Sequence, residues 1–194
     1  MKVFIVYAHP SDTSFTCSAR DSFIRGLVDA GHEYILSDLY RMGFKTDMTE
    51  AEYERESNYN CDSPIPDDVM KEQEKINSSD AIVFIYPVFW TEAPAKLVGW
   101  FDRVWTYGFA YGERQMKQLH KGLVLCTAGH SIKHLCDYKH LEAMKTVMLE
   151  DRMFDRVVNK DFVVMDEMTK WNIEKRNANW KKHLADAYQL GYTF

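Results

Sequence analysis

Four runs of apolar residues, many of them β-branched, recur along the chain and limit the folds that it can adopt. They read KVFIVY (2–7), AIVFIY (81–86), GLVLCT (122–127) and DFVVMD (161–166). Each run is nearly continuous rather than alternating, as expected for a strand that is covered on both faces in a parallel sheet. A weaker fifth segment, HEYILSDLY (32–40), alternates more regularly and is typical of an edge strand.

Helical patterns separate these strands. Ser14 to Ala30 ends at Gly31, a favourable stop, and Asp67 to Asn77 carries acidic residues early and a lysine late, as a helix dipole prefers. Further helices are expected over Pro94–Tyr107, Leu141–Met153 and Thr169–Leu190. The alternation predicts an α/β fold, namely a flavodoxin-like, doubly wound, five-stranded parallel sheet of order 2-1-3-4-5 with helices on both faces.

The chain of 194 residues fits a single domain over 1–194. Its composition, 46% hydrophobic and 27% charged, is typical of a globular protein. The segment 41–66 is polar and turn-rich, so we interpret it as an irregular insertion or a lid, and residues 169–190 are expected to form the C-terminal helix.

The net charge of −5 gives no reason to expect nucleic acid or an anionic membrane as a partner. No apolar stretch approaches the roughly 20 residues that span a membrane, and the N-terminal apolar run is too short for a signal peptide. The four cysteines form no CxxC pair and are expected to be reduced. We therefore expect a cytoplasmic protein without stable membrane insertion.

In doubly wound sheets, ligands bind beyond the carboxyl ends of the strands, where the strand order reverses. This rule selects the loops 9–16, 87–93 and 127–134. The first loop is rich in hydroxyls and precedes a helix, whose free N–H groups and positive dipole end can bind a phosphate. It lacks the glycines of GxGxxG and the Walker lysine. Taken alone, the loop fits ordinary helix capping as well as phosphate binding.

The second loop, YPVFWTEAPA, places Phe89 and Trp90 between two prolines at the end of a strand. We interpret it as a rigid aromatic surface for a flat ligand. In contrast, Trp100, Phe101 and Trp105 follow helical spacing and are expected in the core.

The third loop, TAGHSIKH, has Gly129 where backbone can approach a ligand closely. His130 and His134 are four residues apart, with His140 and two cysteines nearby, but this pattern matches no established zinc spacing. We therefore predict no metal site.

The three loops together resemble the NAD(P)H:quinone oxidoreductase family, which are flavoproteins with a flavodoxin-like fold. The family's AH, TSF and EQ elements match Ala8-His9, Thr13-Ser14-Phe15 and Glu72-Gln73. Its P-x-x-W loop, PA helix start, GWF(D/E)RV element and FAY segment match, in order, Pro87 to Trp90, Pro94-Ala95, Gly99 to Val104 and Phe109-Ala110-Tyr111.

The resemblance implies a flavin, FAD or alternatively FMN, with its phosphate on the first loop and its ring beside Val88 to Thr91. It implies hydride transfer from NAD(P)H through flavin N5 to a quinone or similar acceptor. It also implies a homodimer with the active site at the subunit interface, where Phe109, Ala110 and Tyr111 contact the substrate. The implied cofactor-binding residues are His9, Thr13, Ser14, Phe15, Thr16, Gln73, Pro87, Val88, Phe89, Trp90, Thr91, Thr127, Ala128, Gly129 and His130.

The third loop departs from the family, which often has TTGG followed by a Tyr and a His six residues apart. Here His134 and His140 have that spacing, with Tyr138 between them. We predict His130, His134 and Tyr138 as catalytic groups, and leave open whether His134 or His140 relays protons.

Two other functions remain open at this point. One is a flavodoxin-type electron carrier, which the GFAYG segment and the TEAPA loop disfavour because a carrier needs no pocket closed by a partner subunit. The other is a flavin-binding regulatory subunit of a membrane transporter, which the sequence does not exclude.

Overall fold

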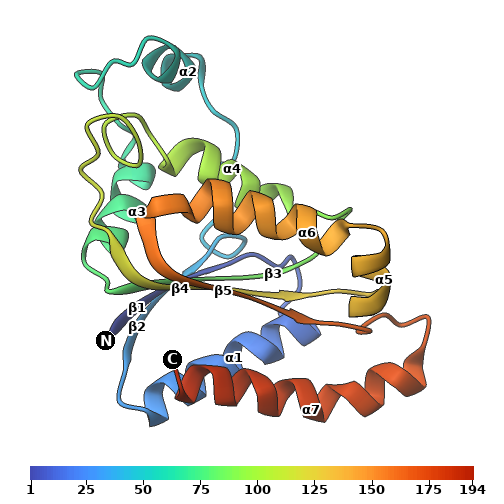
Figure 1. The fold of residues 1–194 in the computed structure, drawn as a ribbon. Helices are drawn as coiled ribbons and strands as arrows, with labels where there is room; N and C mark the ends of the chain where they lie inside the picture. Colours follow the sequence, from blue (N-terminus) through green and yellow to red (C-terminus); the bar gives the residue numbers. More distant parts are fainter.

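A five-stranded parallel sheet between two helical layers forms the structure, a computed structural model of residues 1–194 (Figure 1). The strand order is β2-β1-β3-β4-β5, which confirms the prediction. The strands are β1 (Lys2–Tyr7), β2 (Glu33–Asp38), β3 (Ala81–Pro87), β4 (Leu119–Thr127) and β5 (Val157–Met165).

The continuous apolar runs form the centre of the sheet. Every residue of β3 is buried, as are all but the first residue of β1, because helices cover both faces there. The alternating segment forms the edge strand β2, as predicted. β5 is the other edge strand. The apolar residues of its predicted run pack against the core on both faces, although Phe162, Val163 and Val164 are only half-buried.

On one face of the sheet, α1 (Phe15–Asp29) and α7 (Ile173–Tyr192) lie side by side (Figure 1). Two glycines permit their close contact. A Cβ atom on Gly26 would lie 2.1 Å from the Tyr188 carbonyl oxygen, and one on Gly191 would lie 2.1 Å from that of Phe23. The C-terminal parts of the two helices are consequently in close contact, while Phe15 at the start of α1 packs on Trp180 in the middle of α7.

The other face is covered by α3 (Asp67–Asn77), α4 (Ala95–Val104), α6 (His140–Lys145) and the π-helical η1 (Thr146–Met153). Trp100 and Phe101 are buried here and Trp105 packs against them, as predicted.

The predicted helix 141–153 is α-helical only in its first part, α6, and continues as the π-helical η1. A 3-10 turn, η2 (Phe154–Arg156), leads into β5, and the short α5 (Ile132–Asp137) was not predicted.

The segment 41–66 is not irregular throughout, because it contains α2 (Glu50–Ser57), which lies beyond α4 and away from the sheet (Figure 1). Thr49 and Glu52 form a capping box that fixes its first turn. Arg103 of α4 ties the segment to the body of the protein, since its guanidinium contacts Glu52 at 2.8 Å and Asp68 at 2.6 Å.

None of the helices combines the length and the apolar character that crossing a membrane requires. All four cysteines are free.

Candidate functional site

A pocket of about 420 Å³ lies beyond the carboxyl ends of β1, β3 and β4, where the strand order reverses. The three predicted loops meet there, joined by the connection from β5 to α7. The residues that line it are His9, Ser11, Thr13, Ser14, Phe15, Thr16, Pro87, Val88, Phe89, Thr127, Ala128, Gly129, Met168, Lys170 and Arg176. Most of the predicted cofactor-binding residues are thus brought together.

The first loop ends at the N-terminus of α1. The Ser14 hydroxyl accepts a hydrogen bond from the N–H of Cys17 at 3.1 Å and so caps the helix. In the loop itself, the Ser11 hydroxyl oxygen accepts from the N–H of Thr13 at 3.3 Å. The remaining N–H groups of the first helical turn have no intrahelical partner, so the helix can still bind an anion.

His9 is held at the end of β1 by its neighbour. Its Nδ1 accepts a hydrogen bond of 2.9 Å from the N–H of Ser11, which leaves Nε2 as the donor atom. Partial burial lowers the pKa of His9 below its ordinary value. A neutral imidazole in this position can donate one hydrogen bond to a ligand oxygen.

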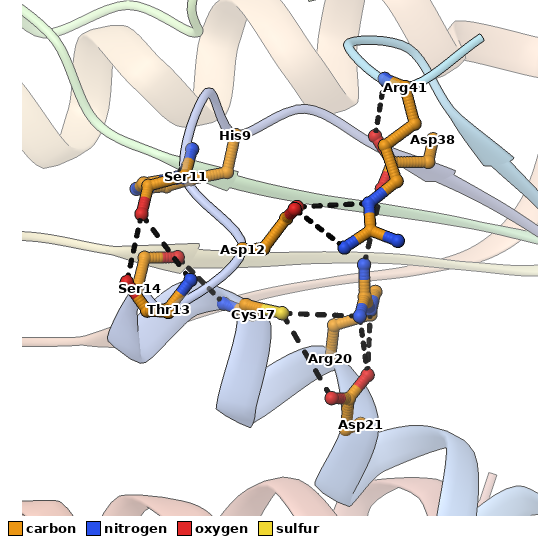
Figure 2. A network of polar contacts seen from close by, with 10 residues as sticks. All are labelled: His9, Ser11, Asp12, Thr13, Ser14, Cys17, Arg20, Asp21, Asp38 and Arg41. Carbon is orange, nitrogen blue, oxygen red and sulfur yellow. Dashed lines mark hydrogen bonds and ion pairs between the residues drawn. The ribbon is translucent and has the colours of Figure 1, made fainter.

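A chain of charged side chains supports the first loop from outside the pocket (Figure 2). Arg41 bonds Asp12 at 2.9 Å, and Arg20 bonds Asp38 at 3.3 Å. Arg20 also donates to the sulfur of Cys17 at 3.2 Å. The network links the loop and the first turns of α1 to the end of β2.

Two cations that the sequence analysis missed, Lys170 and Arg176, also line the pocket. Nε of Arg176 is buried and has no hydrogen-bond partner, while the guanidinium lies over the ring of Trp180 at 4.5 Å. A buried, unpaired N–H of a cation is energetically unfavourable unless a ligand satisfies it. The positions of Lys170 and Arg176 in the sequence do not indicate a binding role, because both residues fall within an ordinary charged helix pattern.

The second loop forms a tight turn at the rim of the pocket. The N–H of Phe89 donates to the carbonyl of Glu92 at 2.8 Å, and the reverse bond is 3.0 Å. The side chain of Trp90 is fully exposed, and Phe89 is 45% exposed. Neither Trp90 nor Thr91 lines the pocket of this chain, so the predicted aromatic surface lies at its edge.

The third loop and α5 carry a group of four neighbouring rings, those of His130, His134, Tyr138 and His140. His130 and His134 are stacked with ring centroids 4.0 Å apart, and Tyr138 lies 4.6 Å from His134. His140 is 6.2 Å from His134. These rings do not line the pocket but lie beside it on α5 and its flanks. No three His, Cys, Asp or Glu side chains converge as metal ligands.

Four predicted residues lie away from the pocket. The side-chain amide of Gln73 is buried and donates to the Val104 carbonyl at 3.1 Å and to Thr106 Oγ1 at 2.9 Å, so it serves the packing of α3 on α4. Phe109 and Ala110 are buried in the core, because their segment folds back under α4. Only Tyr111 is exposed, and its hydroxyl donates to Glu56 at 2.8 Å. Within one chain, none of these residues reaches the pocket.

The fold and the site define a doubly wound α/β protein with a pocket at the switch point of its sheet, lined by hydroxyls, cations and Phe89. The chain belongs to the family described as "Flavodoxin-like fold", whose model matches residues 1–187. The resemblance to the NAD(P)H:quinone oxidoreductases is confirmed by the relatives of the chain.

Among solved structures, the chain is similar to an NAD(P)H:quinone oxidoreductase from Methanothermobacter marburgensis, with 42% identity and a TM-score of 0.89 over 98% of this chain and 96% of that one. It is 35% identical over 123 residues to NAD(P)H dehydrogenase [quinone] 1 of Cavia porcellus, covering 57% of this chain and 45% of the relative. It is also 35% identical to ribosyldihydronicotinamide dehydrogenase [quinone] of Pongo abelii, covering 57% and 53%. The chain spans about half the length of these curated relatives.

Proposed function

We propose that this protein is a flavin-dependent NAD(P)H oxidoreductase that reduces a quinone or a similar acceptor. One observation carries the proposal: a single pocket combines an anion-binding end with a rim of aromatic side chains. The anion-binding end is built from the α1 N-terminus, its hydroxyls, Lys170 and Arg176. The family and the names of the relatives support it.

The residues of the pocket fit a flavin. A phosphate at the start of α1 would receive donors from the helix N-terminus, the Ser11 and Thr13 hydroxyls and His9 Nε2. The buried Nε of Arg176, which lacks a partner, would gain one. The isoalloxazine ring would lie between the second and third loops. There, the N–H groups of Gly129 and His130 make no backbone hydrogen bond and remain available to the ligand.

The bound flavin would supply the two-electron chemistry between NAD(P)H and the acceptor. The chain supplies position: the N–H of Val88 donates to the Thr127 carbonyl at 2.8 Å, which ties together the two loops that would flank the ring. His130, His134 and Tyr138 are proposed as proton donors near the ring edge. Their place next to Gly129, with His130 and Tyr138 exposed and His134 in ring contact with both, supports this role.

Of the two flavins, we favour FAD, with FMN as the alternative. The first loop offers partners for one phosphate, and Lys170 and Arg176, which line the same pocket, offer partners for a second one. Two adjacent phosphates belong to a dinucleotide. Dissociation constants for FAD, FMN and riboflavin test this preference, and equal affinities for FAD and FMN would contradict it.

We also propose that a second copy of the chain completes the site. Tyr59 and Tyr111 are exposed and pack on either side of the half-buried Tyr107, with ring centroids 5.2 Å (Tyr59–Tyr107) and 5.5 Å (Tyr107–Tyr111) apart. Exposed aromatic groups of this kind are frequent at interfaces. The measured molar mass in solution tests the proposal, and a monomer that retains full activity would contradict it.

The decisive experiment uses the purified protein. Flavin absorbance near about 450 nm is expected, with bleaching by NADH or NADPH and recovery on addition of a quinone. A colourless protein that binds neither FAD nor FMN would overturn the proposed function. Bleaching without reoxidation by quinones would instead favour the flavin-binding regulatory subunit, and no bleaching by either nicotinamide would favour an electron carrier.

A further inference from the structure

We infer that Glu92 and Arg152 are positioning residues that hold the Trp90–Thr91 turn in place at the rim of the pocket. Neither residue lines the pocket, and Arg152 comes from η1, 60 residues further along the chain. The relevance of the turn to a flavin rests on the proposed function. The role of the ion pair in holding the turn does not.

The turn is strained. Trp90 and Thr91 have φ angles of 52° and 65°, the left-handed region that favours glycine. Two consecutive residues of this kind form a type I′ arrangement, which normally uses Asn-Gly or Gly-Gly, and a β-branched threonine is especially unfavourable there. Such a conformation persists only where surrounding contacts hold it.

The side chain of Trp90 does not provide those contacts, whereas Thr91 is half-buried. Trp90 is fully exposed, so its indole has no packing partner that would fix its position. Besides the two backbone hydrogen bonds between Phe89 and Glu92, the turn is attached to the body of the protein through the carboxylate of Glu92.

The carboxylate of Glu92 is bound from two sides. Its Oε1 accepts from the N–H of Ala93 at 2.7 Å and from Nη1 of Arg152 at 3.1 Å. The first bond is to the next residue of the chain, and the second connects the carboxylate to η1.

Arg152 is itself rigidly placed. Its side chain is only 12% exposed, and its guanidinium lies 4.6 Å from the ring centroid of the buried Phe101. Its carbonyl accepts a hydrogen bond from Nε1 of Trp105 at 2.8 Å. Arg152 of η1 therefore packs on Phe101 of α4, so the core holds the cation in place and the cation holds the carboxylate of Glu92.

The geometry therefore assigns Glu92 and Arg152 the task of presenting Trp90 at a defined place beside the pocket. An ordinary surface ion pair contributes little to stability. This pair differs because one partner is nearly buried and the other belongs to a strained turn.

The test uses Glu92→Gln, since glutamine keeps the oxygen that accepts from Ala93 and Arg152 but removes the negative charge of the ion pair. Hydrogen exchange of the amides of Phe89 and Glu92 is measured in the flavin-free protein. We expect exchange about fivefold faster in the variant, the size of effect that a partly buried ion pair supports. Asp137→Asn, which removes the exposed Lys133–Asp137 pair on α5, is the matched control and should leave both amides unchanged.

A rescue variant separates the positioning role from a general loss of stability. Thr91→Gly relieves the left-handed strain, so the double variant T91G/E92Q should regain most of the protection of the two amides. In the flavin-loaded protein, the flavin dissociation constant should rise about fivefold in E92Q and recover in the double variant.

Unchanged exchange in E92Q, or a double variant that exchanges as fast as E92Q, would overturn the inference. A wild-type protein that binds no flavin would refute the proposed function instead. The exchange measurement would still decide whether the pair holds the turn.

Discussion

Thr16 Oγ1 and Thr127 Oγ1 share a buried hydrogen bond of 2.8 Å, although 111 residues separate them in the chain. Thr16 lies in the first turn of α1 and Thr127 is the last residue of β4. Both line the pocket, so this bond fixes the proposed phosphate end against the loop proposed to flank the flavin ring. Both groups are uncharged hydroxyls, and removing either one leaves the other without its hydrogen-bond partner.

Replacing Thr127 by Val should leave the Thr16 hydroxyl buried without a partner. We expect the free energy of unfolding to fall by about 1–3 kcal/mol, the cost of an unsatisfied buried polar group. The double variant T16V/T127V should lose less than the sum of the single variants, because no orphaned hydroxyl remains. Urea denaturation measures all three, and strictly additive losses would contradict the expectation.

Gly26→Ala should destabilise the contact of α1 with α7. Alanine favours a helix over glycine by roughly 1 kcal/mol, yet its Cβ would clash with backbone. That Cβ atom would lie only 2.1 Å from the carbonyl oxygen of Tyr188. We expect a net loss of about 2 kcal/mol or more, typical of overpacking. Gly129→Ala is the control, since its Cβ would meet only Thr169 at 3.4 Å, and its stability should change little. Equal melting temperatures for G26A and the wild type would refute the close contact.

The stability of the protein should depend on the Arg103 cluster at acid pH. Burial by itself raises the pKa of Glu52, but hydrogen bonds from Thr49 and Arg103 outweigh it and lower the pKa below the ordinary 4.5. The hydrogen bond from Arg103 lowers the pKa of Asp68 below the ordinary 3.8. A depressed carboxyl pKa in the folded state stabilises the protein above the unfolded-state pKa. This stabilisation is lost as the pH falls through the folded-state value.

We therefore expect Glu52 and Asp68 to make a constant contribution to the free energy of unfolding near neutral pH. This contribution should decline as the pH falls below about 4.5. Arg103→Met should flatten the part of this decline that Glu52 and Asp68 cause, because their pKa values would return toward or above the ordinary values. Denaturation curves at a series of pH values measure it. Parallel pH profiles for the variant and the wild type would show that the cluster does not carry the effect.

Arg176→Met should weaken FAD binding by about tenfold while leaving riboflavin binding nearly unchanged, because a hydrogen bond to a charged group would be lost only from the phosphate-bearing ligand. Isothermal titration with both ligands measures the difference. Arg25→Met on α1, which lies outside the pocket lining, is the control for loss of one positive charge. A similar loss for both ligands would place Arg176 away from the phosphates.

Trp90→Ala should leave the free energy of unfolding unchanged, since the side chain is fully exposed. Flavin affinity or turnover should nevertheless fall, by about tenfold where the indole stacks on the ring. Trp90→Phe should retain most of the affinity because it keeps an aromatic face. Unchanged cofactor content and kinetics in the alanine variant would remove the second loop from the proposed site.

The sequence alone determined the sheet and most of one side of the pocket. Continuous apolar runs predict buried parallel strands, and the strand order then brings His9, Pro87 and Thr127 to one edge. These inferences succeed because the periodicity of a segment reports how its own faces are covered.

Only the tertiary structure decided the rest of the site. Lys170 reaches the pocket from the connection between β5 and α7, Arg176 from the first turn of α7, and Glu92 meets Arg152 of η1, whose guanidinium packs on Phe101 of α4. Gln73, which was predicted to bind the cofactor, donates a hydrogen bond to the Val104 carbonyl inside the core. Such contacts depend on which distant elements become neighbours, and the local pattern of a charged or amide residue is the same whether it faces solvent, a ligand or the core.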